Sequence, residues 1–310
     1  MSEGTSQVPE ESKVIQAVRK WLATQGYPLE MRVAAEFQKT GATVFQSSYH
    51  LTPEGKGREI DVEARYWRMW PINIIQGGVT KPVCAHVFNM IAVCECKSGP
   101  NSQKPWVVFT SKHVAVGTVP LVRFIRMGNN LGSRLLLKVS TKPEIDKLEL
   151  FQVPERCGHS LVVFKPSKDE PSKDDGYDQG YGTLMKVTTA AHAVMKQFAS
   201  VTKDLVSNII VLPTIIVDTP IVECWLDDDG KIQCQEREQT VIVFNNPATG
   251  AGMVMVDIVH ESAVPTHLAK IKAAFDALLA VYHSASPALG YDTVTADPAL
   301  NINNDLVPSV

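Results

Sequence analysis

The sequence predicts an α/β protein whose mixed β-sheet is flanked by helices. Two observations support this: apolar residues first recur at helical spacing, and over the following segments they alternate with a period of two. The 310 residues are 45% hydrophobic and 20% charged, which is enough apolar material to bury a sizeable core. We expect a single domain over residues 1–283 and a flexible C-terminal tail over residues 284–310.

Two helices are expected at the start of this domain. Ser12 is the expected N-cap of the first helix, which ends near Gly26. The second helix is expected over residues 28–40, because Pro28 suits a first helical turn and Gly41 suits the position after the last one.

Three strands are then predicted, at residues 42–51, 58–66 and 87–97, with a turn over 52–57 and an irregular segment over 67–85. The second strand alternates, so one face is expected to carry Ile60, Val62 and Ala64, and the other Glu59, Asp61, Glu63 and Arg65. The third strand is apolar until it ends in Glu95-Cys96-Lys97.

The rest of the chain is expected to extend the sheet and to close it with helices. Strands are predicted at 106–110, 160–165, 208–217 and 252–260, with a hairpin formed by 221–227 and 231–244. Helices are predicted at 182–206 and 266–279, and residues 166–181 form a solvated loop. Residues 120–150 are expected to be a helix followed by mixed structure.

Charge and targeting signals limit the class of protein. Thirty basic and 33 acidic residues leave a formal charge of −3, which excludes a polycation that coats nucleic acid. A local basic groove, or a metal that bridges to phosphate, stays open. The N-terminus lacks a secretion signal, and the most apolar stretch, 209–217, is too short to cross a membrane. With few cysteines and no CxxC pair, we expect a cytoplasmic protein without membrane contact or disulfides.

The carboxylates of the predicted second and third strands suggest a chemistry. Glu95 and Lys97 project from the same face at the end of a buried strand, where charged groups cost free energy unless they are paired or bind a metal. Asp61 on the neighbouring strand would lie within a few ångströms of Glu95, and a divalent cation would remove their repulsion. Such oxygen ligands suit Mg²⁺, with Mn²⁺ as a substitute, and favour phosphate substrates.

These residues support a phosphodiester hydrolysis site. Asp61 and Glu95 would hold the metal, which acidifies water and offsets charge on phosphorus. Lys97 would orient the attacking water and stabilise developing negative charge. Glu36, on the second predicted helix, would assist by holding a second metal or a water.

The ordered set resembles the PD-(D/E)XK nuclease superfamily. Gly57-Arg58-Glu59-Ile60-Asp61 resembles its metal-binding aspartate segment, Val93-Cys94-Glu95-Cys96-Lys97 resembles its E-x-K signature, and Glu36 matches an acidic residue often found on its first helix. The resemblance implies a restriction-endonuclease-like core with additional C-terminal strands and a closing helix. It also implies a metal-dependent nuclease, usually acting on DNA, in which the Cys96 main-chain carbonyl is a further metal ligand.

Two departures from the family pattern concern the strands. The family's proline before the aspartate is absent, and 33 residues separate Asp61 from Glu95. A hairpin turned at Gly77-Gly78 would place Asp61 opposite Cys94, one position from Glu95. A β-bulge or an irregular hairpin tip is therefore expected, and Pro71 and Pro82 favour such an irregularity.

Other interpretations of single residues stay open. The spacing of Cys84, His86, Cys94 and Cys96 allows a zinc site or buried strand thiols. Trp67, Trp70 and Trp106 can stack on bases or fill the core, and Lys112 and His113 can contact phosphate or simply face solvent.

The preferred function is a Mg²⁺-dependent nuclease whose partner is nucleic acid, DNA rather than RNA. One alternative is a non-catalytic scaffold that keeps the nuclease-like fold and binds a protein or nucleic-acid partner, or a second copy of itself. Another is a metal-dependent phosphohydrolase of small nucleotides. No GxSxG elbow, P-loop or GxGxxG motif supports a different chemistry.

Overall fold

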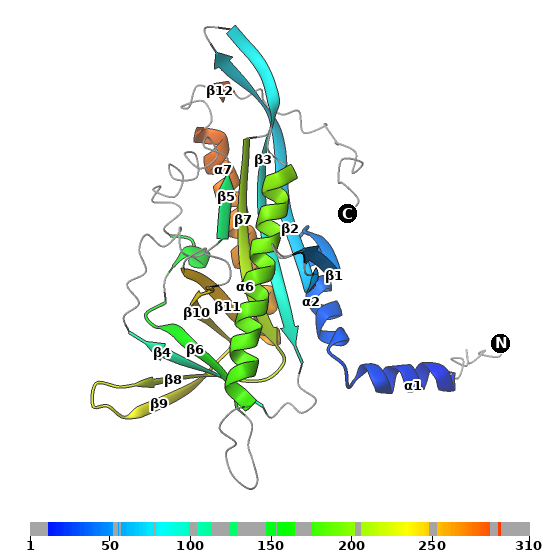
Figure 1. Ribbon diagram of the computed structural model, residues 1–310, viewed down its shortest axis with the longest axis vertical. Coiled ribbons are helices and arrows are strands. Elements are labelled where there is room, and N and C mark those ends of the chain that lie inside the picture. The colour runs from blue at the N-terminus through cyan, green and yellow to red at the C-terminus, as the bar shows by residue number, and fades with distance from the viewer. Residues whose placement is uncertain are drawn as a thin grey trace, which may run out of the picture.

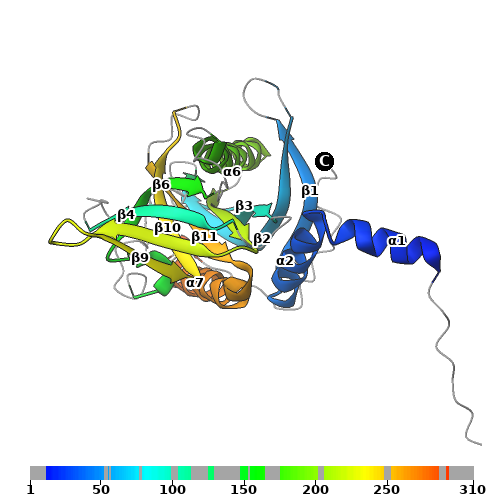
Figure 2. The same cartoon turned by 90° about the horizontal axis from the view of Figure 1, so that it is seen from below.

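The fold is α/β, with one large mixed sheet covered by helices on both faces. The computed structural model describes residues 12–51, 55, 57–76, 79–98, 104–112, 125–128, 147–152, 154–164, 175–201, 206–247, 253–285 and 291–292. Helix α6 (Asp175–Val201) lies on one face of the sheet, and α2 (Tyr27–Lys39) and α7 (Val264–Ala285) lie on the other (Figure 2). This arrangement confirms the predicted α/β class with a mixed sheet flanked by helices.

Over the described residues the sheet has twelve strands, ten of which follow one path in the order β1-β2-β3-β7-β11-β10-β6-β4-β8-β9 (Figure 1). Their bounds are β1 Thr43–Leu51, β2 Gly57–Gln76, β3 Val79–Lys97, β4 Trp106–Ser111, β6 Cys157–Val163, β7 Val206–Val217, β8 Ile221–Leu226, β9 Ile232–Arg237, β10 Gln239–Asn245 and β11 Met253–His260. Two short strands, β5 (Ile125–Gly128) and β12 (Tyr291–Asp292), pair with β7 and β2.

The part of the sheet that carries the predicted site residues is an antiparallel meander followed by a crossover connection. β1, β2 and β3 are antiparallel neighbours in chain order, whereas β7 lies parallel to β3. A parallel neighbour needs a crossover connection, and α6 precedes β7 and packs over the sheet. The order α2, β1, β2, β3, α6, β7 therefore brings residues from both ends of a 190-residue stretch, roughly 27–217, to one edge.

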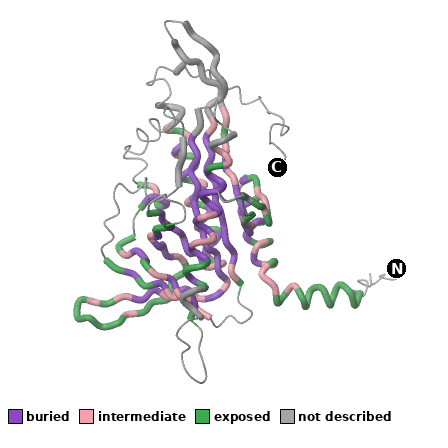
Figure 3. Tube along the Cα trace, viewed as in Figure 1, coloured by how far each residue is buried: buried purple, intermediate pink, exposed green. Residues whose placement is uncertain are grey.

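Local signals at the first two helices act as predicted. The Ser12 hydroxyl accepts a hydrogen bond from the Ile15 amide at the start of α1 (Lys13–Leu22). Pro28 lies in the first turn of α2, and Gly41 follows its end with a φ of 81°. Helix α1 has no buried residue and extends away from the sheet (Figures 1 and 3).

The segment predicted to be irregular, residues 67–85, belongs instead to a long hairpin, so that prediction was wrong. β2 and β3 pair from Val62↔Cys94 to Gln76↔Val79, on either side of Gly77-Gly78. The register shifts between Trp70 and Ile72, at Pro71, which confirms the predicted bulge. On the side of the bulge that contains Asp61, the pairs run up to Val62↔Cys94, and the same register places Asp61 opposite Glu95.

Two apolar cores lie on opposite faces of the sheet. One cluster joins α2 and α7 to the sheet and includes Cys94 and Cys96. The other lies under α6 and includes Ile91 and Val93. Consecutive residues of β3 therefore alternate between the cores, as a strand covered on both faces requires.

Three other element boundaries differ from the predictions. Helix α6 begins at Asp175, inside the predicted loop, because the polar residues there form its first turns. The predicted strand 231–244 is two strands, since β9 pairs with β8 whereas β10 pairs with β11 and β6. Helix α7 and strand β12 extend into the predicted tail. Most of segment 120–150 lies outside the described residues.

Among the described residues, no helix is both long enough and apolar enough to cross a membrane.

Candidate functional site

Two buried carboxylates meet where the ladder between β2 and β3 ends. Asp61 on β2 is 8% exposed, and Glu95 on β3 is 2% exposed. The last backbone pair of the ladder is Val62↔Cys94. Beyond it, the Asp61 carboxylate accepts a hydrogen bond from the Cys96 amide, with 2.7 Å between Oδ2 and N. The side chain of Asp61 thus takes the place of a strand carbonyl and ties the two strand ends together.

A local distortion of the strands accompanies this position. Ser47, which lies opposite Asp61 in the β1–β2 register, has a φ of 49°, in the left-handed region. The alternation of β2 also breaks there, because Ile60 packs in the core under α6 and Val62 in the core against α2 and α7. The prediction that these two residues share one face was therefore wrong. The distortion is consistent with an Asp61 side chain that lies toward β3.

Two lysines converge on Glu95. Lys97 Nζ lies 2.5 Å from Glu95 Oε1, and Lys186 Nζ lies 2.6 Å from the same oxygen. Lys186 also lies 3.6 Å from Asp61 Oδ1, so it contacts both carboxylates. The structure thus brings Asp61, Glu95 and Lys97 together, as predicted, and adds Lys186 from α6.

Sequence reasoning missed Lys186, although a signal was present. It is the only Asp, Glu, Lys or Arg between Asp178 and Lys196, in a stretch of the helix that is otherwise apolar, small or neutral polar apart from His192. A single charge at such a place predicts a buried counter-charge. The crossover helix is held close to the sheet at Gly180, where an added Cβ would come within 2.2 Å of the Leu161 carbonyl oxygen.

The charges of the cluster perturb one another. Burial raises the pKa of Glu95, and the Asp61 charge raises it further, while Lys97 and Lys186 oppose the shift. Burial disfavours the Lys186 ammonium, but its bond to Glu95 and the nearby acidic charges outweigh burial and raise the pKa of Lys186. The charged carboxylate of Glu95 and the charged ammonium of Lys186 therefore stabilise each other.

A further carboxylate, Glu30 from the first turn of α2, is influenced by the charges of this cluster. Burial, followed by the charges of Asp61, Glu59 and Glu95, raises the pKa of Glu30 to about 7. These interactions connect Glu30 with the acidic cluster. No sequence signal distinguished Glu30 from other polar residues of α2.

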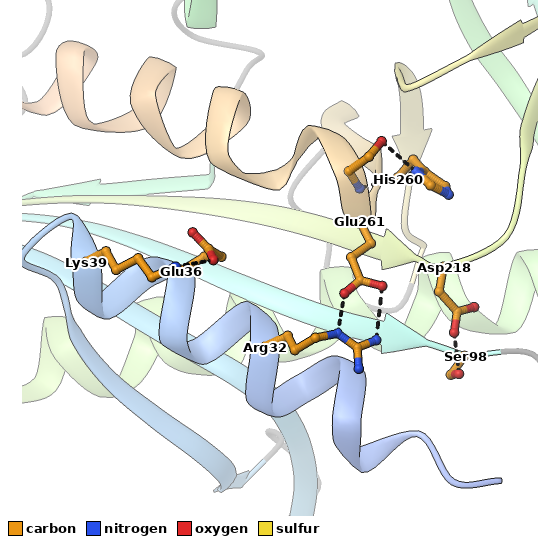
Figure 4. Close-up of polar contacts among 8 residues, drawn as sticks. Arg32, Glu36, Lys39, Ser98, Asp218, His260 and Glu261 are labelled. Atoms are coloured by element: carbon orange, nitrogen blue, oxygen red, sulfur yellow. Dashed lines mark hydrogen bonds and ion pairs between the residues drawn. The ribbon is translucent and has the colours of Figure 1, made fainter. Parts of the chain in front are cut away.

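Glu36, the predicted helix residue, lies elsewhere on α2. Its carboxylate is 2.5 Å from Lys39 Nζ, and it lines a groove of about 520 Å³ together with residues of α7 (Figure 4). Glu36 is six residues from Glu30, or 600° around the helix, so the two side chains occupy different faces. The structure does not bring Glu36 together with Asp61 and Glu95.

Polar links hold the surrounding elements in place. Arg32 of α2 forms a bidentate ion pair with Glu261, which follows β11 (Figure 4). The Ser98 hydroxyl donates to Asp218 at 2.5 Å, joining the segments just after β3 and β7. The ends of the parallel strands and the first half of α2 are thus fixed relative to one another.

The donors available to a metal are carboxylate and main-chain oxygens. Asp61 and Glu95 offer the hard oxygen ligands that suit Mg²⁺, and the Cys96 carbonyl follows Glu95 directly in sequence. Within the described ranges, no three His, Cys, Asp or Glu side chains gather as a metal-binding group. Cys94 and Cys96 pack in the apolar core, which favours the buried-thiol interpretation over zinc. The side chains of Cys84 and His86 lie outside the described residues.

Searches against protein-family models, curated proteins and solved structures gave no match. The site is therefore interpreted from its own chemistry.

The remaining predicted positions contribute little to this cluster. Lys112 pairs with Asp228 at 2.8 Å, and Trp106 is buried in the core under α6. His113 and the side chain of Trp70 lie outside the described residues, and Trp67 is half-buried. A separate cleft of about 770 Å³ holds Glu223, but Arg237 at 3.1 Å and Thr240 already satisfy that carboxylate.

Proposed function

We propose that this protein is a Mg²⁺-dependent nuclease that hydrolyses phosphodiester bonds, with DNA a better substrate than RNA. The observation that supports this most directly is the meeting of Asp61 and Glu95 around a shared cation, Lys186, beside Lys97. Two carboxylates that share one cation offer a divalent ion the negative charge that it requires. Asp61 lies on β2 and Glu95 on β3, and Lys97 follows Glu95 by two residues, as in the E-x-K pattern.

The order of elements also supports the proposal. The aspartate lies on the second strand of the meander and the E-x-K triplet on the third, after a helix and before a crossover helix. This is the arrangement that the resemblance to PD-(D/E)XK nucleases implies for a restriction-endonuclease-like core. The segments after β7 would then be additions to that core.

Each residue of the cluster has a role in the proposed reaction. Asp61, Glu95 and the Cys96 carbonyl would hold the metal, which acidifies the attacking water and offsets charge on the phosphoryl group. Lys97 would orient that water and stabilise negative charge on the phosphoryl oxygens. Glu30, with a pKa near neutrality, can accept the proton that the water loses.

One observation favours the second candidate, a non-catalytic scaffold. The two lysines neutralise Asp61 and Glu95, so the cluster can be stable as a structural ion network without any metal. Such a protein would keep the fold as a surface for a protein or nucleic-acid partner. Metal binding separates the two candidates.

Cleavage assays with Mg²⁺ or Mn²⁺ test the proposal. Labelled single-stranded, duplex and branched DNA, and RNA, are incubated with the wild type, with Glu95→Gln and with Lys97→Met. We expect cleavage of at least one DNA by the wild type and its loss in both variants. Hydrolysis of free nucleotides alone would instead support a small-nucleotide phosphohydrolase, and no hydrolysis with any substrate would support the scaffold.

A further inference from the structure

Lys186 occupies the position that a bridging metal would need. Its Nζ lies 2.6 Å from Glu95 Oε1 and 3.6 Å from Asp61 Oδ1, whereas no contact of Lys97 with Asp61 accompanies its 2.5 Å contact with Glu95. Of the two lysines in this described cluster, Lys186 is therefore the one between the carboxylates. A divalent ion shared by the same oxygens would meet an ammonium at close range.

The lysine is held there by its surroundings as well as by charge. Lys186 projects from α6 beside Leu184 and Val187, which are buried in the core under that helix. The side chain is 30% exposed, so its ammonium can leave the carboxylates and reach solvent without moving the helix.

We infer that Lys186 is a resident cation that gates metal entry, so that a divalent ion binds Asp61 and Glu95 only when the Lys186 ammonium leaves them. This inference rests on the proposed function, because it treats the two carboxylates as metal ligands. In the absence of metal, Lys186 prevents their repulsion and keeps the strand ends together. The cost of displacing it lowers the affinity for metal.

The gate has a simple electrostatic consequence. Replacement of Lys186 by a neutral residue removes one positive charge from within about 4 Å of the ligand oxygens, so the affinity for Mn²⁺ should rise by about tenfold. Replacement by arginine keeps the charge and the competition. The site therefore becomes easier to load, and less stable without metal, when Lys186 is neutral.

Calorimetric titration of the full chain with Mn²⁺ alone tests the gate. The proteins are the wild type, Lys186→Met, Lys186→Arg and a control, Lys196→Met, which removes an exposed charge ten residues along the same helix. We expect about tenfold tighter binding by Lys186→Met, and affinities close to wild type for Lys186→Arg and Lys196→Met. Circular dichroism establishes that each variant is folded, and Lys186→Gln, which can still donate to Glu95, replaces the methionine variant if that one is not.

The outcomes separate this inference from the proposed function. If the wild type binds Mn²⁺ and Glu95→Gln does not, the metal site stands whatever Lys186→Met does. Equal or weaker binding by Lys186→Met would then overturn the gate alone. Absence of binding by every protein, including Lys186→Met, would overturn both the metal site and the gate.

Discussion

Two buried ionic clusters lie two residues apart on β2, and they differ in composition. Glu63 is fully buried and pairs with Arg65, with 2.5 Å between Oε1 and Nε. The guanidinium of Arg65 lies 4.2 Å from the Phe45 ring centre and 4.6 Å from that of Phe198. The aromatic rings cover the base of this pair, and both residues are paired with β1 and with β3, as Phe45↔Glu63, Thr43↔Arg65, Glu63↔Val93 and Arg65↔Ile91.

The cluster at Asp61 has more carboxylates and a more open position. Glu95 contacts two lysines that are each 30% exposed, and one of them, Lys186, also contacts Asp61. The charges of this cluster also act on Glu30, whose pKa is about 7. It lies where a ladder ends, at a strand distortion, whereas the Glu63–Arg65 pair lies within regular pairing. The comparison indicates that burial of a charge alone does not mark a site. A surplus of carboxylates at an accessible strand end does.

The largest expected effect separates the two clusters by activity. Glu95→Gln should reduce DNA hydrolysis by about 10³-fold, because it removes a metal ligand worth several kcal/mol in the transition state. Glu63→Gln, a matched change two residues from Asp61, should keep hydrolysis per folded molecule within about twofold. Initial cleavage rates with saturating Mg²⁺ measure both. Equal losses in the two variants would remove the distinction between the clusters.

The next largest effect concerns the Glu63–Arg65 pair, and it is measured as the free energy of unfolding. Glu63→Ala leaves the Arg65 guanidinium buried without its carboxylate, and we expect the free energy of unfolding to fall by about 3 kcal/mol. The double change Glu63→Leu with Arg65→Met should recover much of that loss, since an apolar pair suits the aromatic surroundings. Urea unfolding followed by circular dichroism measures both. A single variant as stable as wild type would contradict a structural role for the pair.

The third prediction concerns pH and Glu30. Because the pKa of Glu30 rises from 4.5 unfolded to about 7 folded, the native state holds a proton that the unfolded state has lost between these values. The contribution of Glu30 to stability is therefore fully present below pH 4.5 and is lost as the pH rises through 7. Glu30→Gln should remove this part of the pH dependence, and Glu36→Gln should retain it. Urea unfolding from pH 4.5 to 8 measures it, and identical profiles for wild type and Glu30→Gln would contradict the assignment.

The smallest expected effect is that of Glu36. Its pair with Lys39 is a surface ion pair on one helix, so Glu36→Gln should change the free energy of unfolding by no more than about 0.5 kcal/mol. Cleavage should stay within about twofold of wild type, because the side chain lies away from Asp61 and Glu95. A large loss of cleavage with normal folding would restore Glu36 to the site.

Much of the functional core could be predicted from local sequence. The helix ends at Ser12 and Gly41, the E-x-K strand and the bulge near Pro71 all depend on residues close together in the chain. The hairpin turn at Gly77-Gly78 was considered, but the full length of its strands was missed, because prolines and glycines at 71–85 indicated irregular structure, whereas pairing with a neighbouring strand accommodates them. Tertiary pairing here overrides the local preference.

The composition of the site could be predicted only in part. Asp61, Glu95 and Lys97 were found because strand order and alternation limit where their side chains project. Glu30 and Lys186 reach the site from helices, and the choice between Glu30 and Glu36 depends on how α2 is rotated against the sheet. That rotation is determined by packing of Leu29, Val33 and Phe37, and polar residues on the other faces have no sequence signature.

The most direct test of the central claim is anomalous diffraction from crystals of the full chain soaked in Mn²⁺. We predict one peak between the Asp61 and Glu95 carboxylates, within coordination distance of both, and a Lys186 side chain turned away from them. A map with no peak there, in which Lys186 still bridges the two carboxylates at high Mn²⁺ concentration, would contradict the metal site and leave a structural ion network in its place.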